Sequence, residues 1–400
     1  MPRERCDTGG AAALAARVRA SVPPGASVAD DVREIVAAVR AGGDGAVIGF
    51  ERRFGGGEKP LRVSSEELAA ALERLEPAVR AGLKLAADNV RRVAEAGLDA
   101  EAEARLPQGH TVRLREVPVR RAAVYVPAGR NPYPSSVVMG AVTARAAGVD
   151  QVVVATGDHP AILAACALCD VDAVFRMGGA QAIAALAYGT ESVPAADVIV
   201  GPGSLWVQEA KRQVSGDVGI DGFAGPSDLT VILSAGADPA PLRADLLAQA
   251  EHGEGSLVVA VSDEPSLLDA LDGAALEIRA DDIEAALAFA EALAPEHLQL
   301  AGAAAEALAP RVRSAGCLFV GEASGTAFGD YVAGSNHTLP TGGAARFASG
   351  LSVRHFRRRM AEVRVGGAAA ALARAGAPIA DAEGFPRHAA SMRIRENPGP

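Results

Sequence analysis

Two residues near the middle of the chain have side chains that suit a metal ion. Gln249 and His252 stand three positions apart in the stretch LLAQAEHGEG, which is typical of a helix end that stops at Gly253. Side chains at this spacing leave a helix from one face, so an amide oxygen stands beside an imidazole nitrogen. The pair predicts a site for a divalent cation, although the same spacing on its own is more often structural.

Two later stretches carry the further ligands that such a site needs. Asp330 lies in FGDYVAGSNHTLPTGG and His388 lies in DAEGFPRH, and both stretches are glycine-containing loops of the kind that carry function. With Gln249 and His252 these residues make a shell of nitrogen and oxygen ligands, which suits zinc or a similar ion. Because only one of the four ligands is an anion, the ion stays positive and able to hold a substrate.

The dipeptide Glu296-His297 could perform proton transfer beside that ion. It follows Pro295 and begins an apolar strand, where two side chains at a turn can edge one pocket. A histidine with a pKa near neutrality is a natural acceptor for the proton of an alcohol, and a neighbouring carboxylate can activate water. The alternative, a surface dipeptide at a helix-to-strand turn, stays open at this point.

Three turns after predicted strands could bind a dinucleotide, although no G-x-G-x-x-G motif follows a strand. One is the stretch Gly201-Pro202-Gly203-Ser204 and another runs from Phe175 to Gln181; both lead into helices whose free backbone N–H groups suit phosphate. The third, residues 125–129, begins with Tyr125, whose ring could cover a base or a ribose. We expect all three at the carboxyl ends of one parallel sheet, where open α/β sheets bind ligands.

Short apolar runs alternate with helical patterns after residue 110, which indicates βαβ units and parallel sheets. Predicted strands are residues 122–126, 151–156, 173–175, 197–201, 228–234, 256–262, 297–302 and 317–321. Predicted helices between them are residues 135–148, 160–169, 179–187, 204–214, 239–252, 281–293 and 303–314. The fold class is therefore α/β, with two lobes of incomplete Rossmann-like sheets flanked by helices and with N-terminal and C-terminal helical arms.

Four segments follow from this pattern. We expect an N-terminal arm at residues 1–20, and a first α/β domain with the metal and catalytic loops at 21–121 and 229–350. The second α/β domain, which holds the three turns that could bind a dinucleotide, spans 122–228. A C-terminal arm spans 351–400, with a helix, a loop and then the extended end SMRIRENPGP, and it reaches away from its own body.

Composition excludes several classes of function. A net charge of −10 argues against a nucleic-acid surface, and no apolar run approaches the roughly 20 residues of a membrane span. The N-terminal residues make a poor signal peptide, so we expect a cytoplasmic location. In the cytoplasm disulfides are unlikely, and Cys166-x-x-Cys169 lacks the second pair of a zinc ribbon.

Long strings in this chain resemble the histidinol dehydrogenase family, in the family's order and over nearly the whole chain. The matching strings are GGAQAIAALAYGT, VGPG followed by EAKRQV, AGPSD, QAEHG, PEHL, GDYVAGSNHTLPTGG and SGLSV. The resemblance implies oxidation of L-histidinol to L-histidine through L-histidinaldehyde, with two NAD and one zinc ion per subunit. It also implies a homodimer with shared active sites, in which the C-terminal arm completes the partner's site.

Site residues are carried over by motif position. The resemblance implies as zinc ligands Gln249, His252, Asp330 and His388. It implies that His297 takes the hydroxyl proton as general base and that Glu296 activates water. Implied substrate-binding residues are Ser227, Gln249, His252, His297, Asp330, His337, Glu383 and His388. Implied NAD-binding residues are Tyr125, Gln181 and Ser204.

Two departures from the family pattern loosen the assignment of the substrate. Ser204 stands where the family usually has asparagine after GPG, and Asp228 stands where the family has glutamate. Other readings therefore stay open. They are a related zinc- and NAD-dependent dehydrogenase of another small polar alcohol or sulfonated diol, a zinc hydrolase with Glu296 as base, and a non-catalytic metal-binding scaffold.

Overall fold

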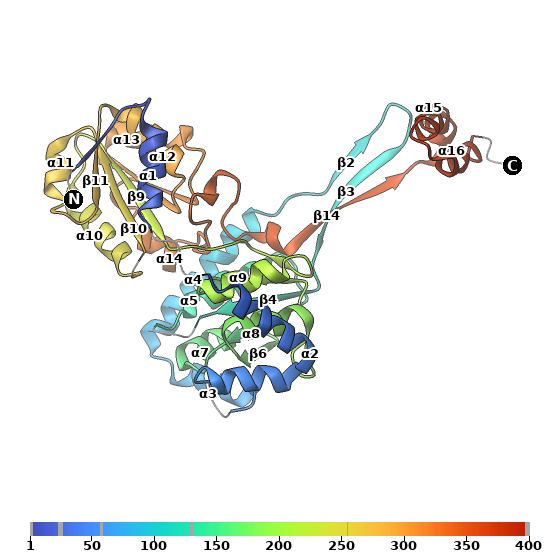
Figure 1. Ribbon diagram of the computed structural model, residues 1–400, viewed down its shortest axis with the longest axis horizontal. Helices are drawn as coiled ribbons and strands as arrows, with labels where there is room; N and C mark the ends of the chain where they lie inside the picture. The colour runs from blue at the N-terminus through green and yellow to red at the C-terminus, as the bar shows by residue number, and fades with distance from the viewer. Residues whose placement is uncertain (1–2, 23–26, 57–58, 128–130, 254, 397–400) are drawn as a thin grey trace. The chain divides into compact units, whose positions relative to one another are not determined.

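The computed structural model describes residues 3–22, 27–56, 59–127, 131–253 and 255–396. The chain divides into two compact units. The first comprises Met1–Gly97 and Val119–Phe356, and the second comprises Leu98–Pro118 and Arg357–Pro400. Figure 1 shows their helices and strands along the chain.

One parallel sheet of the first unit has five strands in the order β6-β5-β4-β7-β8. The strands are β4 (Arg121–Val126), β5 (Gln151–Thr156), β6 (Ala173–Arg176), β7 (Val198–Val200) and β8 (Gly219–Ile220). Helices between them are α5 (Pro134–Val137), the π-helical turn η1 (Val138–Val142), α6 (Thr143–Ala146), α7 (Pro160–Leu168), α8 (Gly179–Tyr188) and α9 (Leu205–Val214). We call this part the cofactor lobe.

Three N-terminal helices belong to the cofactor lobe as well. They are α2 (Ala29–Arg53), α3 (Ser65–Arg74) and α4 (Pro77–Ala96). Residues of β4 alternate between two cores, with Val124 packed among residues of α4 and Tyr125 among residues of α2, as the period of a strand requires. Helix α3 begins after Ser64, which forms a capping box with Glu67.

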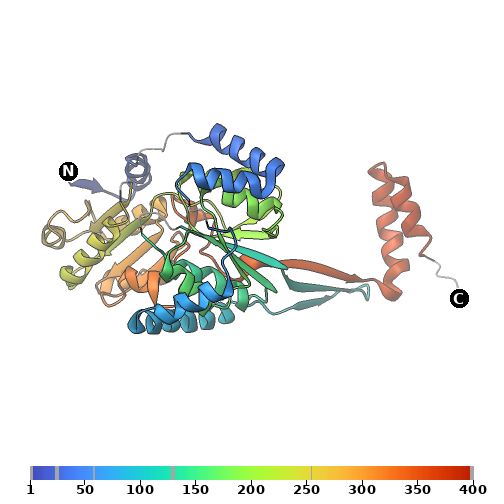
Figure 2. The same ribbon diagram turned by 90° about the horizontal axis from the view of Figure 1, so that it is seen from below.

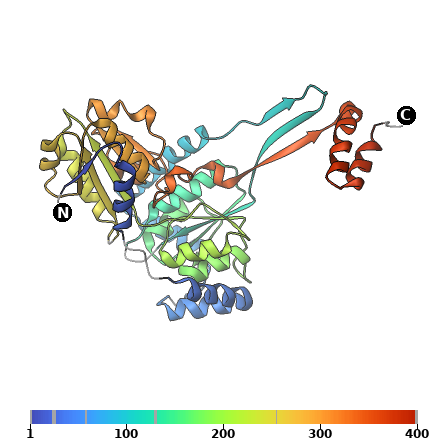
Figure 3. The ribbon, with the colours of Figure 1, turned by 45° about the horizontal axis from the view of Figure 1, so that its top comes forward.

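The other parallel sheet of the first unit has six strands in the order β1-β11-β10-β9-β12-β13. The strands are β1 (Glu4–Cys6), β9 (Asp228–Leu233), β10 (Leu257–Ser262), β11 (Leu276–Ala280), β12 (His297–Ala301) and β13 (Cys317–Val320). Helices around it are α1 (Ala11–Ala20), α10 (Pro239–Ala250), α11 (Pro265–Ala270), α12 (Ile283–Leu293), α13 (Ala303–Glu306) and α14 (Thr326–Tyr331). Short 3₁₀ turns are η2 (Ala309–Arg311), η3 (Ala344–Arg346) and η4 (Val353–Phe356). We call this part the catalytic lobe, and the dark blue α1 lies against its sheet (Figure 3).

The second unit is an antiparallel sheet followed by two helices. Its strands, in the order β14-β3-β2, are β2 (Ala102–Arg105), β3 (Thr111–Pro118) and β14 (Arg357–Arg364). After the turn η5 (Gly366–Ala368), helices α15 (Ala369–Ala382) and α16 (Pro386–Arg393) lie side by side (Figure 2). Only three alanines and the partly buried Met392 form the core between these helices.

The structure bears out the α/β class with two parallel sheets, but the division of the chain differs from the expected one. Residues 1–20 are no separate arm, because β1 pairs with β11 and α1 packs on α12. The helices of residues 29–96 cover the cofactor lobe rather than the catalytic lobe. Which sheet a helix packs against depends on which apolar faces meet, and the helical pattern of one segment does not reveal this.

Three local predictions are also corrected. The strands β2, β3 and β14 were not predicted, because their residues are exposed or half-buried and form no continuous apolar run. The tail expected to be extended at 391–400 is helical to Arg393, and residues 397–400 lie outside the described part. The helix expected at 303–314 is only α13 followed by η2. Within the described ranges, every helix is too short or too polar to cross a membrane.

Candidate active site

The amino ends of β9 and β12 place two buried carboxylates side by side. Ser227 Oγ donates to Glu296 Oε2 over 2.6 Å, and the backbone N–H of Asp228 donates to the same oxygen over 3.0 Å. The N–H of Glu296 in turn donates to Asp228 Oδ1 over 2.8 Å. Burial raises the pKa of Glu296 to about 7, against the opposing influence of His297 and the Ser227 hydrogen bond. Glu296 can therefore exchange a proton near neutrality.

His297, the first residue of β12, is held between acidic groups. Its Nδ1 lies 3.1 Å from the carbonyl oxygen of Asp228, so in the neutral form of the ring this nitrogen carries the hydrogen and Nε2 is the acceptor. Glu296 Oε2 lies 3.7 Å from Nδ1 and Asp330 Oδ1 lies 3.7 Å from Nε2. Burial would lower the pKa of His297, but Asp330 and Glu296 outweigh it and raise that pKa to about 9. The imidazole is thus a strong base that faces Asp330.

Asp228 is itself neutralised by the N-terminal helix. Arg19, on α1, places Nη1 2.6 Å from Asp228 Oδ2 and donates from Nη2 to the carbonyl oxygen of Leu293 over 2.7 Å. Asp228 is only 1% exposed, so its charge needs such a partner. The segment expected to be a separate arm therefore supports the end of the sheet that carries Glu296.

Gln249 and His252 reach the same region from the end of α10. Gln249 is buried and donates from Nε2 to Ser227 Oγ over 2.7 Å, which leaves its Oε1 as the free donor atom for a metal. His252 Nδ1 lies 3.1 Å from the carbonyl oxygen of Gln249, which leaves its Nε2 free. Metal ligands in proteins commonly have their second polar atom fixed in this way. Gln249 Oε1 and His252 Nε2 are thus two atoms available to a zinc ion, and Asp330, beside His297, is a third possible ligand.

His337 lies in the loop between α14 and η3. Its Nε2 lies 3.3 Å from Ser136 Oγ on α5, so this loop contacts the cofactor lobe. Burial lowers the pKa of His337 to about 4, with smaller influences from Asp330, His297 and His252 nearby. A neutral imidazole in this position can accept or donate a hydrogen bond but carries no charge at neutral pH.

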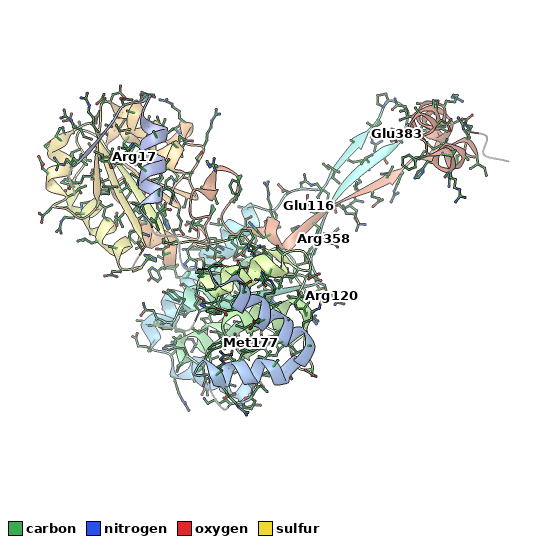
Figure 4. The ribbon with its side chains drawn as sticks, viewed as in Figure 1. Arg17, Glu116, Arg120, Met177, Arg358 and Glu383 are labelled. Carbon is green, nitrogen blue, oxygen red and sulfur yellow. The ribbon has the colours of Figure 1, made fainter. Side chains whose placement is uncertain are left out.

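Glu383 and His388 belong to the second unit. Glu383 ends α15 and is labelled in Figure 4, and His388 on α16 packs its ring edge-on against Phe385 at 5.3 Å between centroids. Among the described residues, no group of three or more His, Cys, Asp or Glu side chains is placed to hold a metal ion.

The three residues expected to bind NAD line a single cavity of the cofactor lobe. The cavity has a volume of about 1110 Å³ and includes Tyr125, Gln181 and Ser204 in its wall. It lies at the carboxyl ends of β4, β5, β6 and β7, as expected for an open parallel sheet. Figure 4 labels Met177, which directly follows β6 and precedes the turn that enters α8. Residues 128 and 129 of the third expected turn lie outside the described part.

A buried ion pair shapes the turn before α9. Lys211 is 1% exposed, pairs with Asp221 and donates to the carbonyl oxygen of Gly201 over 2.8 Å. Asp221 accepts the N–H of Gly201 over 2.7 Å. Gly201 has φ of +119°, and a Cβ there would meet the carbonyl oxygen of Tyr125 at 2.1 Å, so only glycine fits. The pair Lys211–Asp221 thus holds Gly201 against Tyr125, so the turn before α9 lies beside the end of β4.

Comparison with known proteins agrees with this arrangement. The family model described as histidinol dehydrogenase matches residues 20–279 and 269–396. The histidinol dehydrogenase of Nocardia farcinica is 41% identical, with 98% of this chain and 97% of that protein covered. That of Pseudomonas aeruginosa is 40% identical, with 92% of each covered. A crystal structure of the enzyme from Elizabethkingia anophelis is 28% identical with a TM-score of 0.91, and 98% of both chains is covered.

The chain belongs to the histidinol dehydrogenase family. Histidinol dehydrogenases are NAD-dependent oxidoreductases, so the expected family and enzyme class are confirmed. The alternatives, a related dehydrogenase of another alcohol or sulfonated diol, a hydrolase and a scaffold, are not favoured. Sequence reasoning missed three residues that touch the expected site residues. They are Arg19, Asp228 as partner of Glu296, and Glu51, which accepts from Gln181. None of the three lies in a pattern whose spacing predicts the contact.

Proposed function

We propose that this chain oxidises L-histidinol to L-histidine through L-histidinaldehyde, with reduction of two NAD. The observation that carries the proposal is the buried pair Glu296 and His297, with a free imidazole nitrogen and a carboxylate of pKa about 7 beside the donors of a metal shell. Two proton acceptors of different kinds suit two successive oxidations separated by a hydration. A dinucleotide cavity in the same unit supplies room for the hydride acceptor.

The first oxidation needs one base and one anchored alcohol. Zinc held by Gln249, His252, Asp330 and a partner's His388 would hold the substrate's imidazole and amine and supply positive charge. His297 Nε2 takes the hydroxyl proton as the hydride leaves the carbon for NAD. The carbonyl oxygen of Asp228 fixes the ring, and the carboxylates of Glu296 and Asp330 favour the imidazolium that forms.

The second oxidation begins with water. Glu296 takes a proton from the water that adds to the aldehyde, and the hydrate then loses a proton to His297 and a hydride to a second NAD. The balance is one alcohol, one water and two NAD giving one carboxylate, two NADH and three protons. Ser227 and the Asp228 N–H occupy Glu296 Oε2, so Oε1 is the oxygen that meets the water.

We also propose a homodimer in which the second unit completes the partner's site. Glu383 and His388 are exposed on this unit, and its helices share a core of three alanines and Met392. Ile379, Phe385 and Ile394 on the same helices are 59%, 53% and 76% exposed, which is apolar surface that a second copy could cover. A cytoplasmic location stays a prediction.

The stoichiometry of the reaction tests the main proposal. Protein with measured zinc content should yield two NADH per L-histidinol consumed and should form L-histidine. Removal of the metal with a chelator should abolish turnover, and added zinc should restore it. A panel of other small polar alcohols is the control. Zinc-loaded protein that forms no NADH from L-histidinol would defeat the proposal, and turnover of another alcohol alone would assign the substrate to that alcohol.

A further inference from the structure

Two strand-to-helix turns face the cavity of the cofactor lobe, and their hydrogen-bonding groups differ. At the start of α9, Ser204 occupies the N-cap position and makes no side-chain capping bond. At the start of α8, the N–H of Gly178 donates to Glu51 Oε1 over 2.9 Å, and the N–H of Gly179 donates to Tyr125 Oη over 3.1 Å. The α8 turn is thus occupied by an anion of the chain itself, whereas the α9 turn is open.

Glu51 brings this anion from the end of α2. Besides Gly178, its Oε1 accepts from Gln181 Nε2 over 2.9 Å, so the carboxylate is fixed by two donors. Oε2 points toward Gly56, also in the cavity wall, where an added Cβ would fall 2.5 Å away. Among the described residues, Oε2 accepts no hydrogen bond. A carboxylate oxygen of this kind in the wall of a cavity can accept a hydrogen bond from a hydroxyl group of a ligand.

Charge decides which part of a dinucleotide can lie at each turn. A pyrophosphate suits the open N-terminus of α9, whose backbone N–H groups attract anions. A phosphate beside Glu51 would be repelled, whereas a ribose diol offers the hydroxyl donors that Oε2 requires. Two cations of the cavity, Lys59 and Arg176, are already paired with Asp158. They are therefore poor receptors for a further phosphate.

From this arrangement we propose that Glu51 determines cofactor specificity by binding the hydroxyls of the adenosine ribose and rejecting a 2′-phosphate, so that NAD is used and NADP is not. The inference rests on the proposed NAD-dependent function and names a residue outside the metal and proton-transfer groups. The preference for NAD arises chiefly because the negative charge of Glu51 repels the 2′-phosphate of NADP. Arg52, which also lines the cavity, carries a charge that Glu51 would mask.

Binding measurements on the full-length protein test the role of Glu51. Trp206 is the only tryptophan and lines the cavity, so energy transfer from it to reduced nicotinamide reports NADH and NADPH binding without substrate. Glu51→Gln keeps an oxygen that can accept from Gly178 and Gln181 but removes the charge. The matched control is Glu34→Gln, the same change at an exposed position of α2 outside the cavity.

The wild type should prefer NADH to NADPH by at least about tenfold. Glu51→Gln should lower that preference by about tenfold or more, and Glu34→Gln should leave it unchanged. Adding Arg52→Ala to Glu51→Gln should weaken the gained NADPH binding. An unchanged preference, or equal weakening of both cofactors by Glu51→Gln, would overturn the proposal. A wild type that binds neither dinucleotide but folds normally would instead overturn the proposed function.

Discussion

The two parallel sheets of the first unit use opposite ends for their ligands. The cofactor lobe presents turns that follow β4, β5, β6 and β7, so its cavity lies at the carboxyl ends of the strands. The catalytic lobe presents Ser227 and Glu296, which directly precede β9 and β12, so its cluster lies at the amino ends. Gln249 reaches that end because α10 runs back along the sheet.

This difference matches the chemistry of each lobe. At the carboxyl ends, the backbone N–H groups at the start of α9 suit the anionic part of a cofactor. At the amino ends, buried side chains set one another's protonation, as in the pair Glu296 and His297. The lobes therefore divide the work into cofactor binding and proton transfer, and changes in one should leave the other's function intact.

Loss of the imidazole should separate the two functions most clearly. We expect His297→Asn to lower kcat for L-histidinol about 10²- to 10⁴-fold, because no other group accepts the hydroxyl proton at that position. NADH binding, read from Trp206 fluorescence, should stay within about twofold of wild type. The control His159→Asn changes an exposed helix-capping histidine and should leave both measurements unchanged. A large loss of NADH binding by His297→Asn would contradict independent lobes.

The same variant reveals whether the second unit serves a partner. A mixture refolded from His297→Asn and His388→Ala chains should regain about a quarter of wild-type activity, although each variant alone is inactive. About half of the dimers are mixed, and in each of these one site combines an intact catalytic lobe with an intact partner tail. Sites built within one chain would regain nothing.

A smaller effect should follow from the Arg19–Asp228 pair. Arg19→Met keeps the apolar stem but leaves the buried Asp228 carboxylate uncompensated, so we expect a loss of about 2–3 kcal/mol in the free energy of unfolding by urea. The control is Lys59→Met in the cofactor lobe, where Lys59 is 58% exposed. Because exposed pairs contribute little, that loss should be below about 1 kcal/mol. Equal losses of unfolding free energy in Arg19→Met and Lys59→Met would contradict the expectation that the buried pair contributes more than the exposed one.

The sequence predicted the two parallel sheets well because their strands are buried on both faces. Runs such as 151–156 are continuously apolar and stand out between helices, and β5 has the predicted bounds. The second unit could not be found in this way, since β2 is exposed at every residue. The packing of α2 and α4 on the cofactor lobe also escaped prediction, because an apolar helix face indicates burial without naming its partner.

For the candidate site, the local motifs predicted which residues meet but not what supports them. The contacts of the structure connect five residues of these motifs, namely Gln249, Ser227, Glu296, His297 and Asp330. Arg19 lies 209 positions from Asp228, and Glu51 lies 130 positions from Gln181. Contacts over such separations arise from the tertiary fold, and a charged residue on an otherwise ordinary helix gives no sign of them.

The smallest expected effect is a shift of the pH profile set by Ser227. Its hydroxyl donates to Glu296 and thereby lowers a pKa that burial raises to about 7. Ser227→Ala removes this bond to the charged form, so the pKa should rise further, by about one unit. Because Glu296 must be ionised to activate water, oxidation of L-histidinaldehyde should lose rate below a pH about one unit higher than in wild type. The matched control is Ser204→Ala at the cofactor cavity, which should alter NAD affinity without moving the acidic limb of the pH–rate profile. If Ser227→Ala left that limb unmoved, the hydration step would belong to a group other than Glu296.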